Sequence, residues 1–205
     1  MKKLFLLCGI LSSLLYVAMN ILIPIGFEGY SLSLQTVSEL SAIDAPTREV
    51  WVYMAAIYIL LFAAFGIGVL KSSDANRRLK IAGILIMFYC IVNIYWPPMH
   101  LRGYEPTLTD TLHIVWSMIA VVFMLLIMGF GSAAIGKSFR IYTILSMVLL
   151  LVFGYLTGLE APNIPLNLPT PMIGVWERIL IFVYLLWVVV FAVVLLRAVQ
   201  VKVEV

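Results

Sequence analysis

The stretch Val175–Ala198, VWERILIFVYLLWVVVFAVVLLRA, decides the class of fold. From Ile179 to Leu196 it carries no charged residue, and an apolar run of this length can cross a bilayer as an α-helix. The whole chain has the same character, because 64% of its 205 residues are hydrophobic and only 11% are charged. A soluble domain carries roughly a quarter charged residues, so the composition predicts an integral membrane protein.

Clear breaks separate six apolar segments of this kind. The stretch Lys71–Arg78 is polar, Pro97 and Pro98 stop a helix because proline cannot donate to the helical ladder, and residues 163–171 are rich in proline. We therefore predict a single all-α domain over residues 1–205, a bundle of six transmembrane helices at about Leu4–Gly26, Val50–Leu70, Leu79–Trp96, Thr111–Ser132, Ile141–Gly158 and Val175–Ala198.

The basic residues predict the orientation of this bundle. Three of the 13 lysines and arginines, Arg48, Arg102 and Arg178, fall on one side of the predicted membrane. The other ten fall on the opposite side: Lys2, Lys3, Lys71, Arg77, Arg78, Lys80, Lys137, Arg140, Arg197 and Lys202. Of the acids, only Asp74 and Glu204 share that basic side. Short basic loops stay in the cytoplasm, so both termini are predicted to be cytoplasmic in a multi-pass protein of the inner membrane. The small net charge of +3 reflects this topology and indicates no nucleic-acid partner.

The long outer connection Glu28–Glu49 contains Leu34, Val37 and Leu40 at three-residue spacing. This spacing favours a short helix lying in the membrane interface.

Polar side chains gather at the outer ends of the predicted helices, whereas the inner half of the bundle is almost entirely apolar. Polar groups in hydrocarbon are costly, so such a cluster indicates a site. The residues of this outer third are Asn20, Glu39, Asn93, Tyr95, His100, Arg102, Asp110, His113, Glu160, Glu177 and Arg178. We expect an outward-facing polar pocket rather than a channel, in which at least three of His100, Asp110, His113, Glu39 and Arg178 line one cavity.

Asp110 and His113 are three residues apart and so share one helical face. On a structural interpretation, Asp110 caps its helix through the capping box that begins at Thr107, and His113 hydrogen-bonds a neighbour. On a catalytic interpretation, His113 and His100 meet a carboxylate, Asp110 or Glu39, as an acid–base site. The same two histidines with Asp110 are the only metal candidates, and no ligand motif such as HExxH accompanies them, so no metal or other cofactor is predicted.

Arg178, which follows Trp176 and Glu177, is the main candidate for binding a ligand. Its planar fork suits a lipid phosphate, although Glu177 and Arg178 could equally form an interfacial pair. Arg102 beside Gly103 is a second candidate for the same role. The full predicted ligand-binding set is Arg178, Glu177, Arg102, Trp176, Asn93 and Glu39.

Four short motifs together resemble the prokaryotic membrane family called domain of unknown function 998. They are Ser38-Glu39-Leu40-Ser41, Pro98-Met99-His100, Asp110 with His113, and Gly174-Val-Trp176-Glu177-Arg178. The resemblance covers nearly the whole chain and implies that the polar set is a shared feature of the family. It implies no reaction.

Three functions are consistent with these patterns. The first is binding of a lipid headgroup, a small amphiphile or a partner membrane protein at the outer leaflet. The alternative is a membrane-embedded hydrolase or transferase with a His/carboxylate site, and the second alternative is a small transporter. Polar residues continuing to the cytoplasmic face would favour the transporter, and the sequence lacks them.

Overall fold

The computed structural model describes residues 1–201 and is all-helical over that range. Six α-helices are joined by turns and by short 3-10 helices at Ile23–Gly26, Ser38–Ser41 and Ala161–Asn163. Lys202 and Glu204, which entered the prediction of orientation, lie outside the described residues. The α-helices are α1 (Lys2–Leu22), α2 (Arg48–Ser72), α3 (Arg77–Val92), α4 (Leu108–Ala133), α5 (Lys137–Glu160) and α6 (Ile173–Val201).

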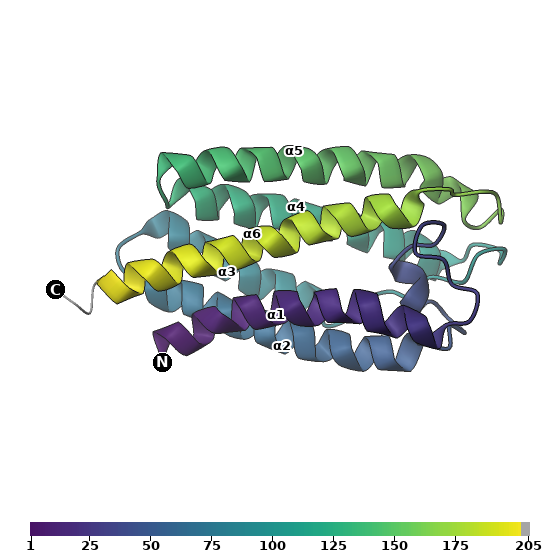
Figure 1. The fold of residues 1–205 in the computed structure, drawn as a ribbon, viewed down its shortest axis with the longest axis horizontal. Helices are drawn as coiled ribbons and strands as arrows, with labels where there is room; N and C mark the ends of the chain where they lie inside the picture. The colour runs from purple at the N-terminus through teal and green to yellow at the C-terminus, as the bar shows by residue number, and fades with distance from the viewer. Residues whose placement is uncertain (202–205) are drawn as a thin grey trace.

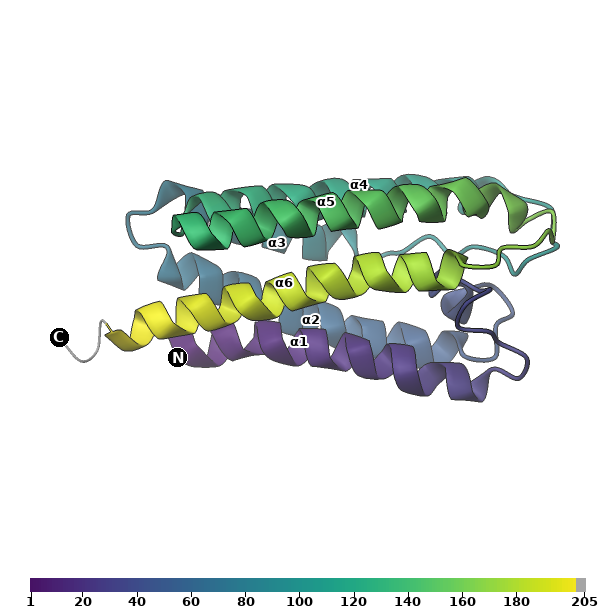
Figure 2. The same ribbon diagram turned by 45° about the horizontal axis from the view of Figure 1, so that its top comes forward.

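The helices lie side by side along the long axis of the molecule (Figures 1 and 2). Each packs against the next in sequence, and α6 returns to pack against α1, so the bundle closes as a ring. The start of α1, the end of α6, and the α2–α3 and α4–α5 turns lie together at one end (Figure 1). The three longer connections, residues 23–47, 93–107 and 161–172, lie together at the other end.

Aromatic side chains fill the centre of the ring. Phe62 and Phe65 of α2 meet Tyr184, Trp187 and Phe191 of α6, and all five are almost completely buried. The Trp187 and Phe191 rings are 4.8 Å apart, within the range that favours offset aromatic pairs. Many apolar residues of α4 and α5 lie exposed on the outside of the ring, as expected for helices that face lipid.

Five of the six helices are long and apolar enough to cross a membrane, and α3 is the exception. We predicted a helix to Trp96, but α3 ends at Val92 and has 16 residues, or about 24 Å at 1.5 Å per residue. The chain then runs in extended form beside α4 (Figure 2). The prolines keep the helix from continuing through Pro97 and Pro98, and Pro97 disfavours the helical conformation at Trp96.

Side chains satisfy the backbone carbonyls that this early ending exposes. The Asn93 amide donates to the Tyr89 carbonyl at 2.7 Å, and the Trp116 indole N–H donates to the Val92 carbonyl at 3.0 Å. Without such partners, carbonyls inside an apolar bundle would be destabilising, which is why broken helices in membranes are buried against other protein. Asn93 and Trp116 therefore have a structural role at the end of α3.

The predicted interfacial helix in Glu28–Glu49 is reduced to the single 3-10 turn Ser38–Ser41. Val37 and Leu40 are buried as their spacing suggests, but Leu34 is 46% exposed. The buried Glu39 side chain, described below, holds this turn in place. The rest of the connection between the first 3-10 helix and α2 is not helical.

Glycines let α1 and α2 approach closely, and they provide a test of the packing. A Cβ at Gly68 would lie 2.9 Å from backbone atoms of Phe5 and Leu6, whereas a Cβ at Gly129 of α4 would meet nothing within 4 Å. We expect Gly68→Ala to destabilise the protein by about 1–3 kcal/mol because α1 must move away. Gly129→Ala should be neutral or slightly stabilising, since alanine favours a helix.

The measurement is the thermal unfolding of both variants in the same detergent, compared with wild type. Equal melting temperatures for the two variants would contradict the α1–α2 contact described here.

Candidate functional site

The candidate site lies in the three long connections at one end of the bundle, together with the first turns of α4 and α6. We call this region the loop cap: residues 23–47, 93–113 and 161–178 (Figure 1). All four sequence motifs singled out above fall within it. They come from separate stretches of the chain, and the helix bundle places them at the same end, as the predicted topology requires.

The centre of the loop cap is an ion pair between Glu39 and Arg102. The Glu39 side chain is 0% exposed, and the Arg102 Nε donates to its Oε1 at 2.8 Å. Arg102 Nη2 donates to the other carboxylate oxygen at 3.0 Å, which completes a bidentate pair of the strong, charge-assisted kind. The Thr36 backbone N–H adds a further bond to Glu39 at 2.8 Å. The carboxylate is therefore fully satisfied inside the protein.

Arg102 also joins the three connections to one another. Its Nη2 donates to the Leu34 carbonyl at 2.8 Å, and its Nη1 donates to the Thr170 hydroxyl at 3.3 Å. Thr170 in turn donates to the Leu34 carbonyl at 2.7 Å. One guanidinium thus contacts all three connections.

Gly174 and Arg178 attach the first connection to the start of α6. A Cβ at Gly174 would collide with the backbone carbonyl oxygens of Leu32 and Gln35, so glycine is required for this approach. Arg178 Nη1 lies within donating distance of the same two oxygens, 2.8 Å from Leu32 and 3.2 Å from Gln35. Its Nη2 donates to the Tyr30 hydroxyl at 2.6 Å, while its Nε is buried without a partner among the described residues.

Glu177 and Tyr30 complete this attachment. The Glu177 carboxylate accepts from the Val37 backbone N–H and, at 3.2 Å, from the Ser38 hydroxyl. The Tyr30 hydroxyl donates to the Thr36 carbonyl at 2.6 Å. Burial raises the pKa of Tyr30 to about 12, against the opposing effect of the Arg178 charge, so this hydroxyl keeps its proton at physiological pH.

Asp110 connects the second connection to α4. It forms the predicted capping box, accepting from the Thr107 backbone N–H at 2.8 Å. It also accepts from the His100 backbone N–H at 2.7 Å, and its Oδ2 lies 2.8 Å from His100 Nδ1. The neighbouring Ile43 N–H donates to the Met99 carbonyl at 2.8 Å, in an isolated bridge that pairs the first and second connections.

His113 lies one turn further along α4 and has different partners. Its Nδ1 is 2.7 Å from the Pro97 carbonyl and 3.1 Å from the Trp96 indole nitrogen. One nitrogen cannot donate to the carbonyl and accept from the indole at the same time, so the tautomer selects between the two bonds. Within residues 1–201, no hydrogen bond joins His113 to His100 or Asp110.

The structure thus divides the predicted site residues into separate groups. Glu39 contacts Arg102, and His100 contacts Asp110. Glu177 and Arg178 hold the first connection, and His113 contacts Pro97 and Trp96. Of the other two predicted ligand residues, Asn93 caps α3, and Trp176 packs on Phe153 with ring centroids 5.6 Å apart. Sequence reasoning missed Tyr30, Thr36 and Thr170, because hydroxyls in a polar connection have no distinctive spacing.

A hollow of about 580 Å³ opens on the side of the loop cap next to Arg178. We call it the Arg178 hollow. One wall is the polar backbone turn of the first connection, and the other is an apolar face of α6. Its lining residues are Tyr30, Ser31, Leu32, Ser33, Val175, Arg178, Ile179 and Phe182.

Within residues 1–201, no group of three or more histidine, cysteine, aspartate or glutamate side chains is placed to hold a metal ion. His100 and Asp110 come together as a pair, and His113 bonds elsewhere.

The fold and the loop cap define a multi-pass helical membrane protein. The family described as protein of unknown function (DUF998) matches residues 10–194. The chain belongs to that family, which confirms the resemblance found in the sequence. No curated protein and no solved structure matches the chain.

Glu39 provides a test of the ion pair at the centre of the loop cap. Glu39→Gln removes the charge that Arg102 neutralises, and breaking a buried pair at one partner costs about 3–5 kcal/mol. We expect a large fall in melting temperature and faster proteolytic cleavage of residues 28–47. The control is Glu28→Gln, at an exposed carboxylate of the same connection, which should change neither. Similar behaviour of both variants would show that the Glu39–Arg102 pair does not stabilise the cap.

Proposed function

We propose that all six helices lie across the cytoplasmic membrane, with both termini in the cytoplasm and the loop cap on the outer side. The distribution of lysine and arginine supports this orientation, because the end that holds the termini carries most of them. α3 is too short to span the bilayer alone, and the extended residues 93–107 complete its crossing against α4.

Cysteine labelling tests this topology. In a background with Cys8→Ala and Cys90→Ala, we introduce Leu166→Cys in the loop cap or Ala75→Cys in the α2–α3 turn, both at exposed positions. A membrane-impermeant maleimide added to intact cells should label the first and not the second. Permeabilised cells, in which both should react, provide the control. Labelling of position 75 alone in intact cells would reverse the proposed orientation.

The loop cap binds the phosphate-bearing headgroup of a lipid in the outer leaflet, at the Arg178 hollow. The observation that supports this proposal is that the Arg178 guanidinium has N–H donors without hydrogen-bond partners among the described residues. Of its five N–H donors, those on Nη1 face carbonyl oxygens and one on Nη2 faces Tyr30, which leaves Nε–H and a second N–H of Nη2. A buried donor without a partner is destabilising, and a phosphate oxygen would satisfy it.

The walls of the hollow suit a lipid better than a soluble anion. Phe182 and Ile179 continue the apolar face of α6 away from the loop cap, in the direction in which acyl chains would lie. The hydroxyls of Ser31 and Ser33 lie on the opposite, polar wall. Because Arg178 also holds the first connection in place, binding at this site and docking of that connection support each other.

Lipid retention tests this site. Phe182→Ala removes part of the apolar wall without touching the bonds of Arg178, and we expect retention of a phospholipid to fall about tenfold. Tyr155→Ala, at an exposed aromatic of α5 outside the hollow, is the matched control and should retain lipid as wild type does. Arg178→Lys keeps the charge but loses the fork, and should reduce retention at least as strongly.

Native mass spectrometry of protein released from nanodiscs measures the retained lipid, and circular dichroism confirms that each variant is folded. Folded Phe182→Ala with wild-type retention would exclude the Arg178 hollow as the lipid site.

A second candidate function is acid–base catalysis by His100. The specific observation is that Asp110 holds its Nδ1, which orients the ring and leaves Nε2 for proton transfer, with the side chain 24% exposed. Neither described hollow is lined by a histidine. An altered lipid composition in cells that carry His100→Asn, with unchanged lipid retention by the purified protein, would favour this alternative.

A further inference from the structure

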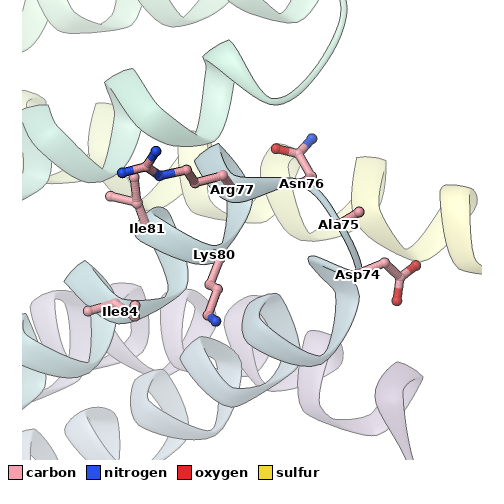
Figure 3. A pocket seen from close by; sticks show the side chains of 7 residues that line it. All are labelled: Asp74, Ala75, Asn76, Arg77, Lys80, Ile81 and Ile84. Atoms are coloured by element: carbon pink, nitrogen blue, oxygen red, sulfur yellow. The ribbon is translucent and has the colours of Figure 1, made fainter.

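A second hollow, of about 490 Å³, lies at the opposite end of the bundle from the loop cap (Figure 3). We call it the turn hollow. It is formed by the α2–α3 turn and the first two turns of α3. Its lining residues are Asp74, Ala75, Asn76, Arg77, Lys80, Ile81 and Ile84.

Two adjacent arginines at this turn have different surroundings. The Arg78 Nη1 donates to the Ala133 carbonyl at 3.0 Å, and the Asn76 amide donates to the Ala134 carbonyl at 3.2 Å. These bonds tie the α2–α3 turn to the end of α4. Within the described part of the chain, the side chains of Arg77 and Lys80 have no carboxylate or carbonyl partner, yet both line the hollow. Arg78 therefore holds the α2–α3 turn against α4, whereas Arg77 and Lys80 are available to bind a ligand.

Most of the backbone N–H groups at the α3 N-terminus already have partners. The Asn76 side-chain oxygen accepts from the backbone N–H groups of Arg78 and Leu79, at 3.1 and 3.2 Å. The Lys80 N–H donates to the Asn76 carbonyl at 3.0 Å. A ligand in the hollow would therefore be held by the Arg77 and Lys80 side chains and not by free helix N–H groups.

The turn hollow is lined by both basic and apolar side chains of α3. Ile81 and Ile84 line it one turn further into α3, and Ile84 is 38% exposed. Ile84 lies about 6 Å deeper along the helix than Lys80, at 1.5 Å per residue. The Asp74 carboxylate is 3.5 Å from the Lys2 ammonium, and it points away from Arg77 and Lys80 (Figure 3). The charge that faces the hollow is therefore positive.

We propose that the turn hollow binds one anionic phospholipid from the leaflet at the basic end of the bundle. Arg77 and Lys80 hold the phosphate, and an acyl chain lies along Ile81 and Ile84. This occupant matches both halves of the hollow, since a soluble anion would leave the isoleucines exposed and an uncharged lipid would leave the two cations unpaired. With the topology proposed above, that leaflet is the cytoplasmic one. The binding site itself depends neither on this orientation nor on the Arg178 hollow.

The test uses full-length protein in nanodiscs of phosphatidylglycerol and phosphatidylcholine mixed one to four, with retained lipids counted by native mass spectrometry. The variant is Arg77→Gln with Lys80→Gln. The control is Lys137→Gln with Arg140→Gln, which makes the same change of net charge at exposed positions in the first turn of α5, at the same end of the bundle. Thermal unfolding in detergent confirms that both proteins are folded.

We expect the Arg77/Lys80 variant to retain one phosphatidylglycerol fewer than wild type and the Lys137/Arg140 control, because occupancy of the turn hollow should fall about tenfold. Ile84→Asn should weaken retention with both cations intact, and millimolar glycerol phosphate should not displace the lipid. When Phe182→Ala is introduced to remove binding at the other hollow, the difference between proteins with and without the Arg77/Lys80 substitutions should remain.

Three results would overturn the proposal: wild-type retention by the folded Arg77/Lys80 variant, an equal loss in the Lys137/Arg140 control, or displacement by glycerol phosphate. The second would assign the effect to overall charge, and the third to a soluble phosphate ligand.

Discussion

The Glu39 carboxylate is enclosed completely, and the Arg102 fork balances the charge at that position. The same guanidinium bonds to the Leu34 carbonyl and the Thr170 hydroxyl, so one ion pair connects all three long connections. Two of the four motifs lie on those connections, and the start of α6, which carries a third motif, docks on the segment that Glu39 anchors. The geometry of the Arg178 hollow depends on that docking, because the turn at Leu32 and Ser33 forms one of its walls.

A second constraint, the satisfaction of backbone carbonyls inside an apolar bundle, explains the residues around α3. The helix stops at Val92, and the Asn93 amide and the Trp116 indole donate to the carbonyls of Tyr89 and Val92. The His113 Nδ1 lies 2.7 Å from the Pro97 carbonyl, further along the chain. His113 is thereby placed beside Trp96 and Pro97 instead of beside His100. Of the candidate acid–base residues, only His100 and Asp110 form a histidine–carboxylate pair among the described residues. Asp110 also has a structural role, because it caps α4.

The two hollows have similar linings although they lie at opposite ends of the bundle. Each combines arginine or lysine at the end of a helix with an apolar helix face that runs away from it. Such a combination suits a phospholipid, whose charged and apolar parts are joined in one molecule. The cations differ in their surroundings: Arg178 is buried and mostly satisfied by the protein, whereas Arg77 and Lys80 are exposed and without partners in the described residues.

The sequence alone determined the class of protein and the capping box at Thr107. It also determined the five helices that are long and apolar enough to cross a membrane, to within a few residues at most ends. It could do so because apolar run length and local spacing are properties of contiguous residues. It also singled out Glu39, Arg102, His100, Asp110 and Arg178. It could not pair them, since Glu39 and Arg102 are 63 residues apart and Arg178 meets carbonyls more than 140 residues away. The end of α3 at Val92 likewise depended on donors from α4. Only the tertiary structure decided which polar groups meet, because in an apolar bundle each buried charge or carbonyl requires whatever partner the packing brings to it.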